Sequence, residues 1–287
     1  MYKSIFTPLS SNGNQASALN FSSALAKTYD AKANCVFTSK SLILLEENQN
    51  KIIAETFKKQ GYAASQEVAD KLYKEQFEQK SIKVKNWFDD LTKKTNSENV
   101  LKWGKALDIF GDSSEQITAE CSLHDLTIAS YDLGASILDT VIDGALFNSG
   151  RPLILTKNFA ENKRIEDSTI ILAWKDTPQT HRAEWFAMPI LQKAKKIYVV
   201  HITEDEDISK NVTIVENHLA KHNVNITSVV IEDAKNPPQA LEEKYNEFNA
   251  DLIVMGAYSH SRLKQIILGG FTKYFLDKES CNLFLTH

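Results

Sequence analysis

Two apolar stretches of this 287-residue sequence occur in the first half and recur, in the same order, in the second. Residues 124–130 (HDLTIAS) pair with residues 250–256 (ADLIVMG), and residues 152–156 (PLILT) pair with residues 282–286 (NLFLT). Short apolar runs of this kind are typical of strands that are buried on both faces of a parallel sheet. Such internal similarity indicates that one structural unit occurs twice, which limits the folds open to the chain.

Strand-like and helical patterns alternate around these runs in both halves. The other predicted strands are residues 3–9, 33–38 and 99–107 in the first half and residues 168–173, 196–202 and 226–231 in the second. Apolar residues recur at helical spacing over residues 14–29, 114–122, 137–147, 179–195 and 212–222, and Pro237-Pro238 opens one further helix. Strands that alternate with helices are parallel strands joined by right-handed crossovers.

We therefore predict an α/β fold with two doubly wound domains in tandem, each built on a five-stranded parallel sheet of the flavodoxin-like type. The first domain covers residues 1–158 and includes a polar, lysine-rich helical insertion over about residues 46–95. The second covers residues 165–287, after a polar linker. We expect two separate sheets that pack as a pseudo-twofold pair. Residues 152–156 and 282–286 are the expected contact, either between the two halves of one chain or between two chains of a homodimer.

Charge and composition narrow the classes of function. A formal net charge of −4 provides no general basic surface for nucleic acid. No run approaches the roughly 18 apolar residues of a membrane span, and the N-terminus is too short and too polar for the apolar core of a signal peptide. The three cysteines are widely separated and lack metal-ligand spacing. We expect a cytoplasmic protein with buried, reduced cysteines that binds neither nucleic acid nor membrane.

The stretch over residues 250–275 carries the strongest functional signal. Its strand ends at Gly256, a polar tip follows at residues 259–262, and the adjacent Gly269 and Gly270 interrupt a helical pattern. Each glycine costs about 1 kcal/mol relative to alanine inside a helix, so we expect a fresh helix to begin near Gly270. Backbone N–H groups at such an N-terminus, with no side chain in the way, are suited to hold phosphate.

The spacing of this loop resembles that of the nucleotide loop of universal stress proteins. The family pattern is Gly, two residues, Gly, nine residues, Gly, then Ser or Thr, and here it begins at Gly256 and reaches Gly269. This chain departs from the pattern at Ser259, which replaces glycine, and at Gly270, which replaces Ser or Thr, although Thr272 lies two residues on. The resemblance implies domains of the adenine-nucleotide-hydrolase-like type and a protein that holds ATP or AMP.

Two further stretches resemble the tandem, two-domain bacterial branch of the family. Residues 149–155 (SGRPLIL) are similar to the strand that closes the first domain, and residues 173–183 (AWKDTPQTHRA) are similar to the start of the second. The resemblance covers nearly the whole chain, and about residues 46–95 are unmatched. It implies a stress-response function for the tandem pair.

The expected fold and the resemblance together place a nucleotide site in the second domain. In an open parallel sheet, ligands bind at the carboxyl ends of the strands, where the winding reverses. The candidate binding residues at this edge are Ala173, Lys175, Gly256, Ser259, His260, Gly269, Gly270, Phe271 and Thr272. Lys175 stands where nucleotide-binding members have an aspartate, so it either pairs with phosphate directly or only solvates the loop. No metal is required.

The first domain is predicted to have lost this site. Ser130 stands where Gly256 stands in the second domain, and residues 7–9 contain no acid. Asp143 lies in the stretch that corresponds to the glycine pair, where its charge would repel phosphate. We therefore expect nucleotide in the second domain only.

Three classes of function stay open. The first is a stress-response protein that binds ATP or AMP, the second is a nucleotide-free dimeric interaction module of the same family, and the third is a slow ATP hydrolase. The departures from the family loop point away from tight ATP binding, whereas the retained glycines and Thr272 point toward it. The histidines show no metal-ligand spacing and no nucleophile elbow is present, so enzymatic activity is not expected. We place nucleotide binding first.

Overall fold

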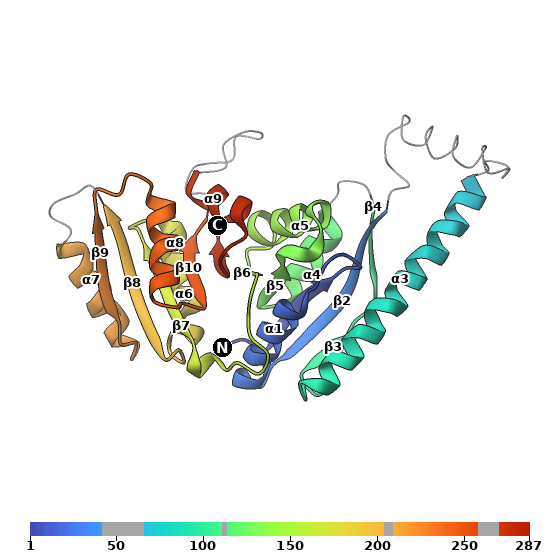
Figure 1. The fold of residues 1–287 in the computed structure, drawn as a ribbon, viewed down its shortest axis with the longest axis horizontal. Coiled ribbons are helices and arrows are strands. Elements are labelled where there is room, and N and C mark those ends of the chain that lie inside the picture. The colour runs from blue at the N-terminus through green and yellow to red at the C-terminus, as the bar shows by residue number, and fades with distance from the viewer. Residues whose placement is uncertain (42–65, 111–113, 204–208, 258–269) are drawn as a thin grey trace.

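The computed structural model describes residues 1–41, 66–110, 114–203, 209–257 and 270–287 (Figure 1). The first half contains β1 (Ser4–Leu9), α1 (Ala16–Tyr29), β2 (Lys32–Ser41), α3 (Gln66–Lys94), β3 (Leu101–Trp103), β4 (Leu107–Phe110), α4 (Glu115–Leu123), β5 (Leu126–Ser130), η2 (Tyr131–Leu133), α5 (Ala135–Ile142), η3 (Asp143–Asn148) and β6 (Leu153–Thr156). After η4 (Ile165–Asp167), the second half contains β7 (Thr169–Trp174), α6 (Pro178–Leu191), β8 (Lys196–Thr203), α7 (Ser209–Lys221), β9 (Thr227–Glu232), α8 (Pro237–Glu247), β10 (Leu252–Gly256), α9 (Gly270–Lys278) and β11 (Leu283–Thr286).

The strands form one sheet in the order β3-β2-β1-β5-β6-β11-β10-β7-β8-β9, with β4 paired to β2. Within each half every pair is parallel, and the two halves have the same order when their strands are numbered along the chain. The winding therefore reverses between β1 and β5 in the first half and between β7 and β10 in the second. The predicted α/β fold of two doubly wound units is confirmed.

The two halves meet through their last strands, as predicted, and the contact lies within the chain. β6 and β11 pair antiparallel, with Leu283 opposite Leu155 and Leu285 opposite Leu153. Hydrogen bonding is therefore continuous across the whole sheet, where two separate sheets were expected. The reason is that the last strand of each half has an open edge, and pairing satisfies the backbone groups of both edges.

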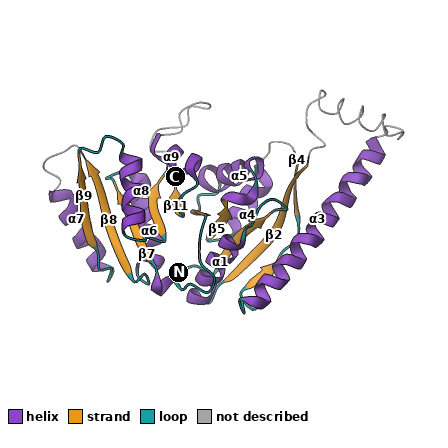
Figure 2. Cartoon of the chain, in the orientation of Figure 1, coloured by secondary structure: helices purple, strands orange, loops and turns teal. Residues whose placement is uncertain are grey.

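Two layers of helices cover the two faces of this sheet (Figure 2). Alternate residues of a strand point to opposite faces, so Ile170 and Leu172 of β7 belong to one core and Ile171 to the other. Helices α1, α3, α6 and α7 contribute to the first core, and α4, α5, α8 and α9 contribute to the second. Both cores run through both halves, so the halves share their apolar interior as well as their sheet.

The predicted polar insertion contains the crossover helix of the first half. Its described part, α3, lies between β2 and β3 in the chain, just as α7 lies between β8 and β9. The Phe77 ring of α3 lies 5.3 Å from the Phe37 ring of β2, and Phe88 lies 5.3 Å from Trp103 of β3. Residues 46–65 of the predicted insertion lie outside the described residues. Among the helices that the structure describes, none is long and apolar enough to cross a membrane.

The third predicted strand of the first half, residues 99–107, is wrong in its bounds. The chain forms two short strands there, β3 and β4, which pair with successive parts of β2. The elongated β2 provides edge enough for both. Sequence periodicity alone could not show where the chain leaves and rejoins this edge.

The repeated aspartate of the two matching stretches ties neighbouring strands together. Asp125 precedes β5, and its Oδ2 accepts hydrogen bonds from the N–H groups of Lys3 (2.7 Å) and Ser4 (3.1 Å) at the start of β1. Asp251 precedes β10, and its Oδ2 accepts from the N–H of Thr169 (2.9 Å) at the start of β7. The same side chain thus ties β1 to β5 in the first half and β7 to β10 in the second.

Candidate functional site

At the carboxyl edge of the second half, the helices that follow the neighbouring strands β7 and β10 cover opposite faces of the sheet. α6 follows β7 on one face of the sheet, and α9 follows β10 on the other. Ala173 and Lys175 lie at the end of β7 and just beyond it, and Gly256 ends β10, the neighbouring strand. The structure therefore brings these three predicted site residues to one edge, which is the position at which open parallel sheets bind ligands.

Gly256 has a packing role that does not depend on any ligand. A Cβ atom at this position would lie 2.6 Å from the carbonyl carbon of Gln179 and 2.7 Å from the backbone nitrogen of Thr180. The Thr286 hydroxyl of β11 donates to the Gln179 carbonyl oxygen at 3.0 Å. The first turn of α6 thus rests directly on the end of β10, and only glycine leaves room for it.

The short connection from β7 to α6 positions Lys175. Thr177 is the N-cap of α6: its Oγ1 accepts from the N–H of Thr180 at 3.3 Å, and Pro178 occupies the first helical position. Asp176, next to Lys175, contacts His181 Nε2 at 2.8 Å. Lys175 is exposed, and no hydrogen bond or ion pair joins its ammonium to the part of the chain that the structure describes.

The N-terminus of α9 is the second component of this edge. Gly270 is exposed, and a Cβ atom there would have no atom within 4 Å. Phe271 packs on Phe275 with ring centroids 5.7 Å apart, and Thr272 is only 3% exposed. The N–H groups of Gly270 and Phe271 are therefore better placed for an anion than the Thr272 hydroxyl. The other predicted loop residues, Ser259, His260 and Gly269, lie outside the described residues.

A buried glutamate that the sequence analysis missed holds α9 in place. Glu242 of α8 is 8% exposed, and its Oε2 accepts from the Tyr274 hydroxyl and the Lys278 ammonium, both at 2.6 Å. Its Oε1 accepts from the Ser280 hydroxyl. Burial by itself raises the pKa of this carboxyl, but the three donors outweigh burial and hold the pKa below its usual value. No sequence pattern marks Glu242, because its partners lie on a different helix.

His201, near the end of β8, is a buried residue of the core. It is 2% exposed, and its Nε2 has no hydrogen-bond partner among the residues that the structure describes. Burial lowers the pKa of the imidazole, and Glu216 opposes the change. Within the described residues there is no cluster of three side chains able to hold a metal ion.

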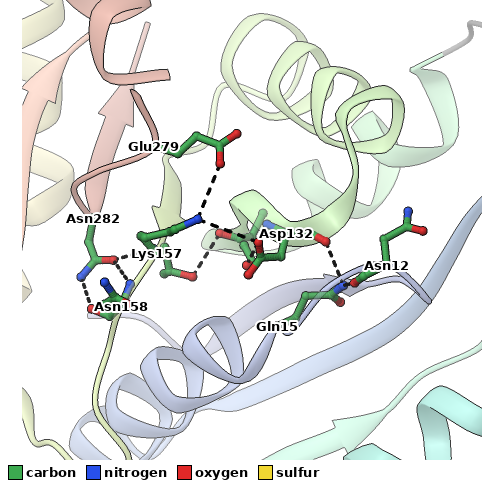
Figure 3. A network of polar contacts seen from close by, with 10 residues as sticks. Asn12, Gln15, Asp132, Lys157, Asn158, Glu279 and Asn282 are labelled. Atoms are coloured by element: carbon green, nitrogen blue, oxygen red, sulfur yellow. Dashed lines mark hydrogen bonds and ion pairs between the residues drawn. The ribbon is translucent and has the colours of Figure 1, made fainter. Parts of the chain in front are cut away.

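The equivalent edge of the first half is filled by the protein's own polar groups (Figure 3). Gln15 is 1% exposed, and its Oε1 accepts from the N–H of Ser10 at 2.7 Å. Its amide nitrogen donates to Ser10 Oγ (3.0 Å), to the Asn12 carbonyl and to the Asp132 carbonyl (3.3 Å). Ser10 Oγ and Asn12 Nδ2 donate to the Leu133 carbonyl at 2.9 and 3.0 Å. The loop after β1 is thus bonded to the segment after β5.

The filled edge of the first half is also tied to the second half. Lys157, which follows β6, has its ammonium 4.0 Å from Asp132 Oδ1 and 3.7 Å from Glu279 Oε2 (Figure 3). The Asn282 amide oxygen accepts from the N–H groups of Lys157 (2.8 Å) and Asn158 (3.2 Å), and its nitrogen donates to the Asn158 carbonyl (2.7 Å). These contacts brace the junction of β6 and β11.

Part of this chain is similar to a known protein family, and the whole chain is similar in structure to several known proteins. Residues 201–287 match the model of the Universal stress protein family. No curated protein matches the chain. A universal stress protein from Archaeoglobus fulgidus DSM 4304 has a similar structure, with a TM-score of 0.69 and 14% identity over 99% of this chain and 95% of that one.

Two proteins from Pseudomonas aeruginosa are also similar in structure. A functionally unknown protein from strain PAO1 has a TM-score of 0.56 and 11% identity over 99% of this chain and 92% of that one. A putative universal stress protein from strain UCBPP-PA14 has a TM-score of 0.53 and 12% identity over 99% of this chain and 93% of that one. At these identities the structures establish a common fold over the full chain.

Proposed function

We propose that this chain, which carries a universal stress protein domain, binds an adenine nucleotide, ATP or AMP, at the carboxyl edge of its second half. In this proposal the chain has two structural domains, residues 1–158 and residues 165–287. The cellular role is a stress response in the cytoplasm, as the family resemblance implies. No metal ion is needed to hold the nucleotide in this proposal.

The observation that carries the proposal is the N-terminus of α9, the helix that follows β10 in the chain. It begins at Gly270, which is exposed and at which a Cβ atom would have no atom within 4 Å. A helix N-terminus with exposed N–H groups favours phosphate through hydrogen bonds and through the helix dipole. Lys175, at the end of the neighbouring strand, adds a positive charge with no acid partner among the described residues.

The nucleotide-free interaction module is the second candidate. The packing role of Gly256 favours it, because that glycine would be retained for the contact with Gln179 even if no nucleotide were bound. At the equivalent edge of the first half, the protein's own side chains satisfy the polar groups of the loop after β1 without a ligand, which is consistent with this candidate. Slow ATP hydrolysis is the weakest candidate, since the acid–base contact described at the edge of the second half, between Asp176 and His181, joins two exposed side chains.

The direct test is to identify what the purified protein carries and what it takes up. We expect denaturation of the protein to release ATP or AMP, identified by mass spectrometry, or the nucleotide-free protein to bind ATP, ADP or AMP in calorimetry. If no nucleotide is released, and millimolar ATP, ADP and AMP give no heat, the proposal fails and the interaction module takes its place. Incubation with ATP and assay of released phosphate separates binding from hydrolysis.

A further inference from the structure

A second concave site lies at the opposite edge of the molecule. A cavity of about 460 Å³ opens between α1, the residues just after α3, and residues 162–166, which connect the two halves. Its wall includes Asn20, Lys27 and Thr28 of α1. These residues and the connecting segment precede β2 and β7, so the cavity lies at the amino edge of the sheet, away from Gly256 and α9.

Cationic side chains dominate the charge of this cavity. Lys27, Lys163 and Arg164 line it, and Glu166 is the one acid in its lining. Cations that gather in a concave site raise the local concentration of anions. The volume falls within the range of about 300–1,000 Å³ that is usual for small-molecule sites.

Each of the three cations is held in position by a contact of its own. Lys27 Nζ donates to the Thr95 carbonyl at 3.0 Å, and Lys163 Nζ pairs with Asp251. Arg164 binds Asp167 through two parallel hydrogen bonds, from Nε at 2.8 Å and from Nη2 at 2.9 Å. Groups that are already oriented lose less conformational entropy when a ligand binds.

After these contacts, the cationic side chains still have N–H groups that could bind a ligand. An ammonium has three N–H bonds and a guanidinium has five, so the Lys27 contact and the Arg164 pair leave several donors for a ligand. Asn20, which also lines the cavity, donates its amide N–H to the Phe159 carbonyl at 3.0 Å, and its amide oxygen is an additional acceptor. The cavity can thus offer charged donors to an anionic group and neutral polar groups to the remainder of a ligand.

We propose that this cavity binds a small phosphate monoester, such as a sugar phosphate. A guanidinium fork and an ammonium match the two-oxygen and single-oxygen contacts that phosphate makes. The volume exceeds the needs of inorganic phosphate, and the polar wall suits a hydroxylated body. The bound ester would join α1 to the segment that connects the two halves. This site is independent of the nucleotide site proposed above.

The test is calorimetry on the full chain with ribose 5-phosphate as the probe, and with ribose and succinate as controls for the phosphate group. We expect ribose 5-phosphate to bind at micromolar to millimolar concentration, and ribose to give no heat. Lys27→Met and Arg164→Met should each weaken binding about tenfold or more, because each removes a charged hydrogen bond to phosphate. Glu166→Gln should strengthen binding by about two- to fivefold, because it removes the one repelling charge.

Lys94→Met is the matched control. Lys94 precedes Thr95 and pairs with Glu161 at 2.7 Å, but it does not line the cavity, so its loss should change the affinity by less than twofold. The substituted residues are exposed, so melting curves should show all four variants folded. Three results would overturn the proposal: no heat with ribose 5-phosphate at millimolar concentration, equal affinity for succinate, or losses in Lys27→Met and Arg164→Met no larger than that in Lys94→Met.

Discussion

The carboxyl edges of the two halves occupy the same place in the same topology, yet the described residues make different contacts at the two edges. In the first half, six residues connect β1 to α1, and Gln15 and Asn12 bond them to the segment after β5. In the second half, three residues connect β7 to α6, and the first turn of α6 rests on Gly256. The longer loop is thus the one whose side chains are bonded across the edge of its half.

This difference shows how a repeated fold can keep one site and lose the other. The longer loop of the first half reaches across the switch point and satisfies its own polar groups, so that half needs no ligand. In the second half, the shorter loop leaves Lys175 exposed, and Gly270 at the N-terminus of α9 is exposed as well.

Exchanging the residue types that end β5 and β10, Ser130 and Gly256, should have the largest effect on stability. Gly256→Ser places a Cβ atom against the backbone of α6, which cannot move without breaking its packing, so we expect a loss of about 3 kcal/mol in unfolding free energy. Ser130→Gly, the reverse change, removes only the cap on the N–H of Asp132 and should cost about 1 kcal/mol or less. Urea unfolding of both variants checks this, and equal losses would contradict the packing role of Gly256.

Removing the side chain that closes the first half should come next. Gln15→Ala removes the partner of the buried Ser10 N–H group and of the Asn12 and Asp132 carbonyl groups, so we expect a loss of about 2–3 kcal/mol. Gln192→Ala is the control, because Gln192 is exposed and donates one hydrogen bond, to the His222 carbonyl at 3.0 Å. It should cost about 0.5 kcal/mol or less. A similar loss in both variants would mean that the closed edge is not specifically stabilised by Gln15.

The Glu242 contacts that hold α9 predict a pH dependence confined to the second half. A carboxyl whose pKa is lowered on folding contributes stability above its unfolded pKa, and that contribution is lost as the pH falls through its folded pKa. Glu242→Gln should lower the unfolding free energy by about 1–2 kcal/mol at pH 7. It should also reduce the slope of stability against pH below about pH 4.5, the unfolded value. Unchanged slopes in the two proteins would show that the Glu242 carboxylate contributes nothing.

The smallest effect concerns affinity rather than folding. Lys175→Met should leave stability within about 0.5 kcal/mol of the parent, because Lys175 is exposed, and should weaken ATP binding about tenfold through the loss of one charged contact. Lys193→Met is a suitable control, since Lys193 is also exposed and lies between α6 and β8 at the opposite edge. Calorimetry with ATP distinguishes them, and equal affinities would assign Lys175 to the solvated loop.

The elements of the second half were the part of the fold that the sequence predicted best. β10 and β11 lie within residues 250–256 and 282–286, because their short apolar runs have clear ends in Gly256 and in polar residues. The role of the repeated aspartate was not predictable. Asp125 and Asp251 bond to residues that lie 82–122 positions away in the chain, and periodicity carries no information at that range.

For the candidate site, too, the sequence predicted some features and not others. The sequence placed Lys175, Gly256 and Gly270 at one edge, because strand ends and helix starts are local signals. It did not reveal that Gly256 packs on Gln179, that Thr272 is buried, or that Gln15 closes the first half. Each of these depends on how a helix lies against a strand that the chain reaches only after a crossover.

The most direct test of the central claim, that nucleotide binds the second half and not the first, is hydrogen exchange of the full chain with and without saturating ATP. The account predicts slower exchange at the end of β7 and at the N-terminus of α9, with unchanged exchange in residues 10–15 and 130–134. Protection in residues 10–15 and 130–134, or no protection in either half at saturating ATP, would contradict it.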